Sequence, residues 1–274
     1  MLTRIDHVMI GVLDLQQGID TYTRIGFDIY PGGVNTARGT RNAIAFHTED
    51  YLELAATTDP EKARFRYVAV QSDDLAADVA AMRRRSVDVA DPTEGGRTTP
   101  AGQELRWTIA VLGKRHSLPV FFVQHLTPLD ERRRQVPRAA QHPNGVFRVD
   151  RVYIAVADVA AAAKELSQVL GLPVPKAQRG GVIKADMCVF DLGPTGLTVA
   201  QPAEPGPAAE ALERQGPGPF QALYRTSSMD AAARWMADHG VPPPIRGIRN
   251  TGEQAMLVPP EHACGAYIGL VGPA

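Results

Sequence analysis

One pattern occurs four times in this chain: a short alternating apolar strand, then a helix, then further strands. The copies begin near residues 5, 65, 149 and 220. In the first three, an aspartate (Asp14, Asp74 and Asp158) stands nine positions after the start, where its carboxylate can cap a helix. A repeat of this length is typical of a unit that buries its apolar face by pairing with a neighbour. The longest gap separates the second and third copies, so the sequence predicts two paired domains.

The first copy shows the pattern most clearly. Alternation in its first strand places His7 on the face opposite Val8 and Ile10. A helix is expected over residues 16–25, and Gly26 suits the left-handed conformation that ends a helix. Further strands are expected over 27–30, 42–47 and 51–55, with a loop rich in Gly and Arg after the first of these.

The later copies vary this scheme. In the second, residues 91–97 are expected to form a loop over a site opening. In the fourth, Asp230 stands before the expected helix. A linker is predicted over 127–147, with a charged helical piece from 129 to 135. The predicted domains are therefore 1–126 and 148–274.

Composition excludes several functional classes. Apolar residues make up 44% and charged residues 22% of the 274 residues, which is the balance of a globular protein. A net charge of -1 predicts no nucleic-acid or membrane partner. The chain has two cysteines, no apolar run long enough for a membrane span and no signal-peptide pattern at its start. We therefore expect a cytoplasmic protein.

The sequence resembles the vicinal oxygen chelate superfamily in its repeated strand-helix-strand-strand-strand unit. The resemblance also rests on the opening Ile5-Asp6-His7-Val8, the helix after Asp14, the turn Ile25-Gly26-Phe27 and the closing Leu52-Glu53-Leu54. That group includes glyoxalase I, bleomycin-resistance proteins and extradiol dioxygenases. The resemblance implies an α+β fold in which four βαβββ modules pair into two open-barrel glyoxalase-like domains. It also implies a metal and substrate site inside a barrel.

The resemblance points to a set of site residues in the N-terminal domain. By position, His7 matches the first-strand metal ligand and Glu53 the last-strand ligand. Tyr67 takes the place of His7 in the second module, where it can supply a hydrogen bond or a proton. We expect Gln124 to face the interior as the third ligand, with Tyr67 or His125 as alternatives.

The residues themselves support a polar site at this place. A carboxylate between Leu52 and Leu54 is unfavourable by several kcal/mol, as an order of magnitude, unless it is paired or bound to metal. His7 alone could equally be a half-buried histidine that bonds to backbone. Together, His7 and Glu53 predict a divalent metal site that accepts Zn, Mn, Ni or Fe.

Two functions follow from these expectations. The first is a metal-assisted lyase, isomerase or dioxygenase that acts on a small organic substrate with adjacent oxygens, with Glu53 as ligand or proton shuttle. The second is a metal-free protein that binds or sequesters a small molecule, as bleomycin-resistance proteins do.

The C-terminal modules lack such a ligand set. Arg151 stands at the His7 position, Thr198 at the Glu53 position, and the fourth module offers Ala222 or Leu223. This half is expected to be structural, to cover substrate or to form a homodimer.

Overall fold

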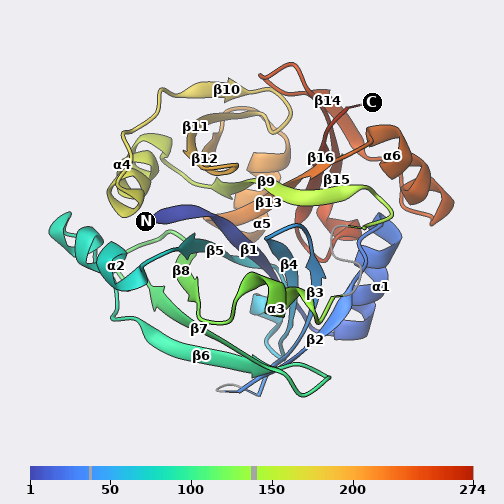
Figure 1. Ribbon diagram of the computed structural model, residues 1–274. Coiled ribbons are helices and arrows are strands. Elements are labelled where there is room, and N and C mark those ends of the chain that lie inside the picture. The colour runs from blue at the N-terminus through green and yellow to red at the C-terminus, as the bar shows by residue number, and fades with distance from the viewer. Residues whose placement is uncertain (37–38, 137–140, 274) are drawn as a thin grey trace.

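The computed structural model describes every residue except 37–38, 137–140 and 274. Its described part contains four βαβββ modules, as predicted, which form two large sheets (Figure 1). The first two modules make the lower half of Figure 1 and the last two the upper half. The fold is α+β.

The N-terminal modules form a closed barrel in the strand order β1-β4-β3-β2-β6-β7-β8-β5. The first module comprises β1 (Leu2–Val12), α1 (Leu15–Ile25), β2 (Tyr30–Asn35), β3 (Arg41–Phe46) and β4 (Tyr51–Ala56). The second comprises β5 (Phe65–Ser72), α2 (Leu75–Arg84), β6 (Thr93–Thr98), β7 (Glu104–Val111) and β8 (Val120–His125). A short 3-10 turn, Pro60–Lys62, joins the two modules.

The C-terminal modules form an eight-stranded sheet in the order β10-β11-β12-β9-β13-β16-β15-β14. The third module comprises β9 (Val146–Ala155), α4 (Val159–Leu170), β10 (Gln178–Gly180), β11 (Ala185–Leu192) and β12 (Thr195–Pro202). The fourth comprises β13 (Gly218–Thr226), α6 (Met229–Asp238), β14 (Ile245–Ile248), β15 (Gln254–Val258) and β16 (Tyr267–Val271). Helix α3 (Leu129–Arg133) connects the two halves, α5 (Pro207–Gln215) precedes β13, and a 3-10 turn, Pro260–His262, precedes β16.

The helix boundaries have local causes that the sequence indicated. Asp14 accepts hydrogen bonds from the backbone amides of Gln16 and Gln17 at 2.8 and 3.1 Å, which satisfies two free donors at the start of α1. Gly26 ends α1 with a φ of 99°. In the fourth module the cap is Ser228 instead of Asp230, which lies inside α6. None of the described helices is both long and apolar enough to cross a membrane.

Two segments expected to be loops are strands instead. These are β2 and β6, whose glycines reflect close packing. A Cβ on Gly33 would lie 2.1 Å from the carbonyl oxygen of Thr98, and one on Gly95 would lie 2.6 Å from Nε1 of Trp107. Glycine within a strand commonly marks such a close approach. The strand expected over 27–30 begins only at Tyr30.

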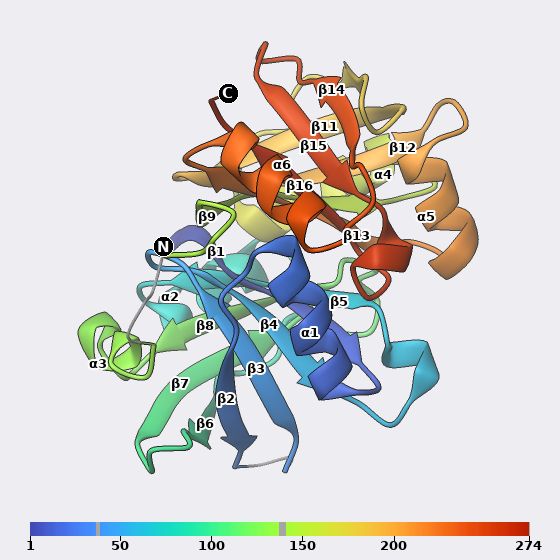
Figure 2. The ribbon, with the colours of Figure 1, turned by 90° about the vertical axis from the view of Figure 1, so that its right-hand side faces the viewer.

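The two sheets share one hydrophobic core. The N-terminal strands β1 and β5 pack on the C-terminal strands β9 and β13, as the centre of Figure 2 shows. The hydrogen bonds that join the two halves include one from the Ile5 amide to Oγ1 of Thr195 at 2.8 Å and one from the Val149 amide to Oδ1 of Asp50 at 3.0 Å.

Candidate functional site

The interior of the N-terminal barrel is a cavity of about 940 Å³. His7, Glu53 and Tyr67 all line it, as does His125. Strand alternation explains this, because His7 points inward while Val8 and Ile10 are fully buried.

His7 and Glu53 approach each other across neighbouring strands β1 and β4. Nε2 of His7 lies 3.5 Å from Oε2 of Glu53. Nδ1 of His7 lies 2.7 Å from Oδ2 of Asp6, so the ring donates its Nδ1 hydrogen to that carboxylate. A neutral His7 then presents the lone pair of Nε2 toward a carboxylate oxygen. These two atoms can share a cation, which is either a metal ion or a proton on Nε2.

Asp6 contacts two of the histidines at this part of the cavity, a role that no sequence pattern indicated. A β-bulge interrupts the pairing of β1 with β5 between Ile5 and His7, and such a bulge re-aims a side chain. Oδ1 of Asp6 also accepts a hydrogen bond from Nε2 of His125 at 2.9 Å. Complete burial tends to raise the pKa of Asp6, but the charges and hydrogen bonds of His125 and then His7 hold this pKa well below its usual value.

Further contacts fix His7 and Glu53 in place. The ring of Tyr51 stacks on the ring of His7 with centroids 4.5 Å apart, and Phe121 meets the same ring at an edge. Asn42 donates a hydrogen bond to Oε1 of Glu53 at 2.8 Å. Only Oε2 of Glu53 therefore faces His7. Burial raises the pKa of Tyr51 well above its usual value, and the nearby carboxylates of Asp6 and Glu53 add to this effect.

The other residues expected at the site lie in different surroundings. Tyr67 lines the cavity, is 40% exposed and packs edge-on against Phe121, so its hydroxyl is accessible to a ligand. The expectation that Gln124 faces inward is wrong. Its side chain accepts a hydrogen bond from the amide of Leu75 at 2.9 Å and donates to the carbonyl of Asp73 at 3.1 Å, so it caps α2 outside the barrel.

The chain offers two well-placed donors for a divalent metal. Ligand atoms bound to a tetrahedral ion at about 2.1 Å lie about 3.4 Å apart, which fits the separation of His7 Nε2 and Glu53 Oε2. The hydrogen bonds of Asp6 and Asn42 to the far sides of these groups are the contacts that orient metal ligands. In the described ranges, no group of three or more His, Cys, Asp or Glu side chains gathers as a ready ligand set.

Among the described residues, the lining of the cavity carries more cationic side chains than carboxylates. Four carboxylates line the cavity, at Glu53, Asp59, Glu61 and Glu94. Six cationic side chains line it, at Arg41, Lys62, Arg64, Arg66, Arg97 and Lys114. Lys62 is paired with Asp59 at 2.7 Å. The remaining positive charge favours an anionic ligand.

The C-terminal sheet repeats this geometry with different residues. Register places Arg151 in β9 opposite Leu223 in β13, and Thr198 beside Tyr153, which confirms Arg151 and Thr198 as the counterparts of His7 and Glu53. Neither Ala222 nor Leu223 replaces Tyr67. Tyr67 pairs with Met9 in the N-terminal barrel, and Gln221 pairs with Tyr153, the counterpart of Met9, in the C-terminal sheet. Gln221 is therefore the counterpart of Tyr67.

Sequence and structure comparisons agree with this architecture. The model of the family described as "Glyoxalase-like domain" matches residues 5–170. The model described as "Glyoxalase/Bleomycin resistance protein/Dioxygenase superfamily" matches residues 150–257. No curated protein shows significant sequence similarity to the chain.

Solved structures with the same fold extend over almost the whole chain. A hypothetical protein from Staphylococcus aureus is similar with a TM-score of 0.67 and 12% identity, covering 99% of this chain and 100% of that one. A mutant of 4-hydroxymandelate synthase from Streptomyces coelicolor is similar with a TM-score of 0.68 and 15% identity, covering 99% and 92%. At these identities the likeness concerns the fold. The chain belongs to the glyoxalase-like domain family of the vicinal oxygen chelate superfamily, with two such domains in tandem.

Proposed function

We propose that the N-terminal barrel is the active site of a divalent-metal-assisted enzyme that acts on a small anionic organic substrate with adjacent oxygens. The observation that carries this proposal is the 3.5 Å approach of His7 Nε2 to Glu53 Oε2, with Asp6 bound to the other ring nitrogen of His7. Nε2 and Oε2 together suit a cation. Zn, Mn, Ni and Fe all accept this nitrogen and oxygen pair.

When bound, the metal would polarise substrate oxygens and stabilise the negative charge that develops on them. Glu53 is placed to move a proton, because Asn42 holds one of its oxygens and leaves the other directed into the cavity. Tyr67, which lies in β5, can donate its hydroxyl hydrogen to a substrate oxygen. These roles suit a lyase or isomerase that moves a proton beside a carbonyl group, and an iron-loaded form would permit dioxygenase chemistry.

The cationic side chains in the cavity lining favour an anionic substrate. Arg41, Arg66 and Lys114 line the cavity without an ion pair in the described part of the chain. They can attract a carboxylate or phosphate group while the oxygen-bearing carbon lies near His7 and Glu53.

A metal-free binding protein is the second candidate. The described residues provide no third His, Cys, Asp or Glu donor, which favours a protein that holds a small molecule between its strands. In that case the cation between His7 and Glu53 is a proton, and His7 is an imidazolium ion.

Metal content distinguishes these two candidates. Protein purified without chelator or affinity metal, then incubated with each candidate ion and desalted, should retain about one ion per chain by mass spectrometry of the metal. His7→Gln and Glu53→Gln should each abolish retention. Glu94→Gln removes a carboxylate that lines the same cavity but pairs with Arg106 at 2.6 Å, so this control should retain the ion. Absence of retained metal in the native protein would reject the metalloenzyme and leave the binding protein.

A further inference from the structure

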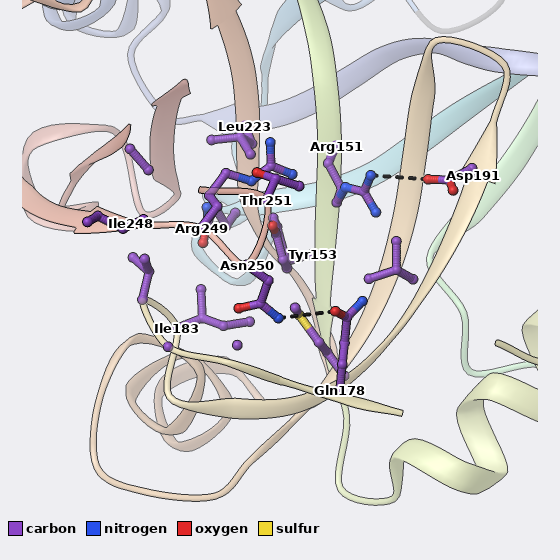
Figure 3. Close-up of a pocket in the computed structure, with 17 residues that line it drawn as sticks. Arg151, Tyr153, Gln178, Ile183, Asp191, Leu223, Ile248, Arg249, Asn250 and Thr251 are labelled. Carbon is purple, nitrogen blue, oxygen red and sulfur yellow. Dashed lines mark hydrogen bonds and ion pairs between the residues drawn. The ribbon is translucent and has the colours of Figure 1, made fainter. Parts of the chain in front are cut away.

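The concave face of the C-terminal sheet encloses a second, smaller pocket of about 240 Å³ (Figure 3). Its walls are mainly apolar, and they include Val182, Ile183, Met187, Val189 and Leu223. It lies in the sheet that lacks the His7 and Glu53 pair, so the site proposed above does not account for it.

Side chains from both edges of the sheet close this pocket. Asn250, which follows β14, donates hydrogen bonds to Oε1 of Gln178 at 3.1 Å and to the carbonyl of Arg179 at 2.7 Å, both in β10. Figure 3 shows Asn250 and Gln178 joined across the opening. A Cβ on Gly247 would lie 2.7 Å from Val182, which shows how closely the two edges approach. The two edges of the sheet are thus joined by side-chain hydrogen bonds beside the pocket.

Two buried polar atoms in the pocket lining have no hydrogen-bond partner among the residues that the structure describes. Gln221 is 4% exposed, and its Oε1 has no hydrogen-bond partner among the described residues. The Nε of Arg151 is likewise buried and without a partner there. An unsatisfied acceptor or donor in an apolar pocket is unfavourable by about 1–3 kcal/mol. A ligand that carries both a donor and an acceptor would satisfy both atoms.

The position of these residues limits the size of such a ligand. Arg151 lies opposite Leu223 and Gln221 opposite Tyr153, so Arg151 and Gln221 are diagonal neighbours on adjacent strands. Diagonal neighbours of this kind are about 7–8 Å apart at their Cα atoms. A molecule with one six-membered ring can span the distance between their side chains.

The positive charge of Arg151 favours a ligand with a negative charge. Its Nη2 pairs with Oδ1 of Asp191 at 3.1 Å; the Arg151 side chain is 15% exposed and the Asp191 side chain is 76% exposed. Because Asp191 lies mostly in water, a ligand carboxylate can replace it at little cost and engage Nε as well. Arg249 is not available in the same way, because it pairs with both Asp150 and Glu253.

We infer that this pocket is a second, metal-free binding site for a small hydroxylated monocarboxylate. Arg151 binds its carboxylate, Gln221 accepts a hydrogen bond from its hydroxyl, and the apolar walls hold its body. Asn250 and Gln178 form the closure over the bound molecule.

Calorimetric titration of the full chain with 4-hydroxybenzoate tests this assignment. Benzoate, which lacks the hydroxyl, and 4-hydroxybenzamide, which lacks the charge, are the matched probes. Arg151→Met should weaken binding of 4-hydroxybenzoate and benzoate by at least about 10-fold, since hydrogen bonds to charged groups are the stronger ones. Gln221→Leu should weaken 4-hydroxybenzoate by about 3- to 10-fold and leave benzoate unchanged. The benzamide should bind at least about 10-fold more weakly than 4-hydroxybenzoate.

A control in the other cavity assigns the signal to one site. Arg66→Met makes the same change in the lining of the N-terminal cavity and should leave the affinity for 4-hydroxybenzoate unchanged. Arg151→Lys retains a charge without the Nε donor and should weaken binding by a smaller factor than Arg151→Met. It replaces Arg151→Met as the test variant if Arg151→Met does not fold, as judged by circular dichroism. The inference is overturned if the native chain does not bind 4-hydroxybenzoate, or if Arg66→Met abolishes binding while Arg151→Met retains it.

Discussion

Asp6 and His7 are consecutive residues of β1, yet their side chains meet, with Oδ2 of Asp6 2.7 Å from Nδ1 of His7. A regular strand would send them to opposite faces. The bulge in β1 removes that separation and lets one buried carboxylate bind both His7 and His125. Asp6 is therefore a positioning residue that determines which nitrogen of His7 faces Glu53.

Replacing Asp6 by Asn tests this positioning role. Asp6→Asn preserves the shape of the side chain but removes the charge that favours the Nδ1–H form of His7. Loss of such an orienting carboxylate typically weakens metal binding by about 10- to 100-fold. Metal titration followed by competition with a chelator measures the change. Asp20→Asn alters an exposed carboxylate of α1 and should leave the affinity unchanged; an unchanged affinity in Asp6→Asn would contradict the role.

The opposite orientations of Gln124 and His125 give a second prediction. Gln124→Ala should lower the free energy of unfolding by about 1–2 kcal/mol, because two backbone groups at the start of α2 lose their partner. It should leave metal retention unchanged. His125→Gln should impair metal retention, since it removes one of the two rings bound to Asp6. Denaturant unfolding and metal analysis of both variants check this contrast, which fails if Gln124→Ala alone loses metal.

Much of the fold was predictable because it depends on local patterns that repeat. Asp14, Asp74 and Asp158 all cap their helices, and alternation in β1 correctly directed His7 inward. The approach of His7 to Glu53 was expected from the family resemblance, and in the parallel strands β1 and β4 Glu53 pairs with Met9, two residues after His7.

The rest of the site was not predictable from local pattern. In β8, Phe121 and Phe122 are both apolar, so composition does not reveal which face is inward. The structure directs Phe121 into the cavity and buries Phe122 in the core, which turns Gln124 outward. The bulge at Asp6 has no sequence signal of its own. Asn42 and Tyr51 belong to the site only through tertiary contacts with Glu53 and His7.

Two helix-ending glycines that look equivalent in sequence should tolerate substitution differently. Gly26 and Gly171 both adopt positive φ, at 99° and 71°. A Cβ on Gly26 would lie 2.7 Å from Cβ of Asn144, whereas one on Gly171 would meet only the flexible Arg85 side chain at 3.0 Å. Gly171→Ala should therefore destabilise the protein by about 1–2 kcal/mol, the usual cost of a left-handed residue. Gly26→Ala should lower the free energy of unfolding by clearly more than Gly171→Ala does. Denaturant unfolding measures both, and equal effects would contradict the steric argument.

A buried histidine pair at the boundary of the two halves should make stability depend on pH. Nδ1 of His142 accepts a hydrogen bond from the Asp28 amide, so its Nε2 carries a hydrogen and donates it to Nδ1 of His47 at 2.8 Å. Burial lowers the pKa of His142 to about 4 and also lowers the pKa of His47.

The unfolded chain, with histidine pKa values near 6.5, therefore binds protons more readily than the folded chain between pH 6.5 and 4. The contribution of His142 to stability is complete above pH 6.5 and declines as pH falls. Between pH 7 and pH 5, the free energy of unfolding of the native protein should fall by about 2 kcal/mol more than that of His142→Gln. Denaturant unfolding at both pH values checks this, with the exposed His239→Gln as a control that should behave like native protein. Equal losses in native protein and His142→Gln would contradict the prediction.

Asp50 lies at the same boundary, and its contribution to stability should change with pH in the opposite direction. Burial raises its pKa to about 8, despite the hydrogen bond from the Val149 amide. The folded chain thus keeps a proton on Asp50 between pH 4 and 8, while the unfolded chain has released it. Stability from this residue declines as pH rises.

Asp50→Asn retains the acceptor for Val149 and removes this titration. The unfolding free energy of Asp50→Asn relative to native protein should therefore increase by roughly 3 to 4 kcal/mol between pH 4 and pH 7. Denaturant unfolding across this range measures the difference directly, because the opposing contributions of His47 and His142 are common to both proteins. A difference that stays constant with pH would show that the Asp50 carboxyl has the same pKa in the folded and unfolded chain.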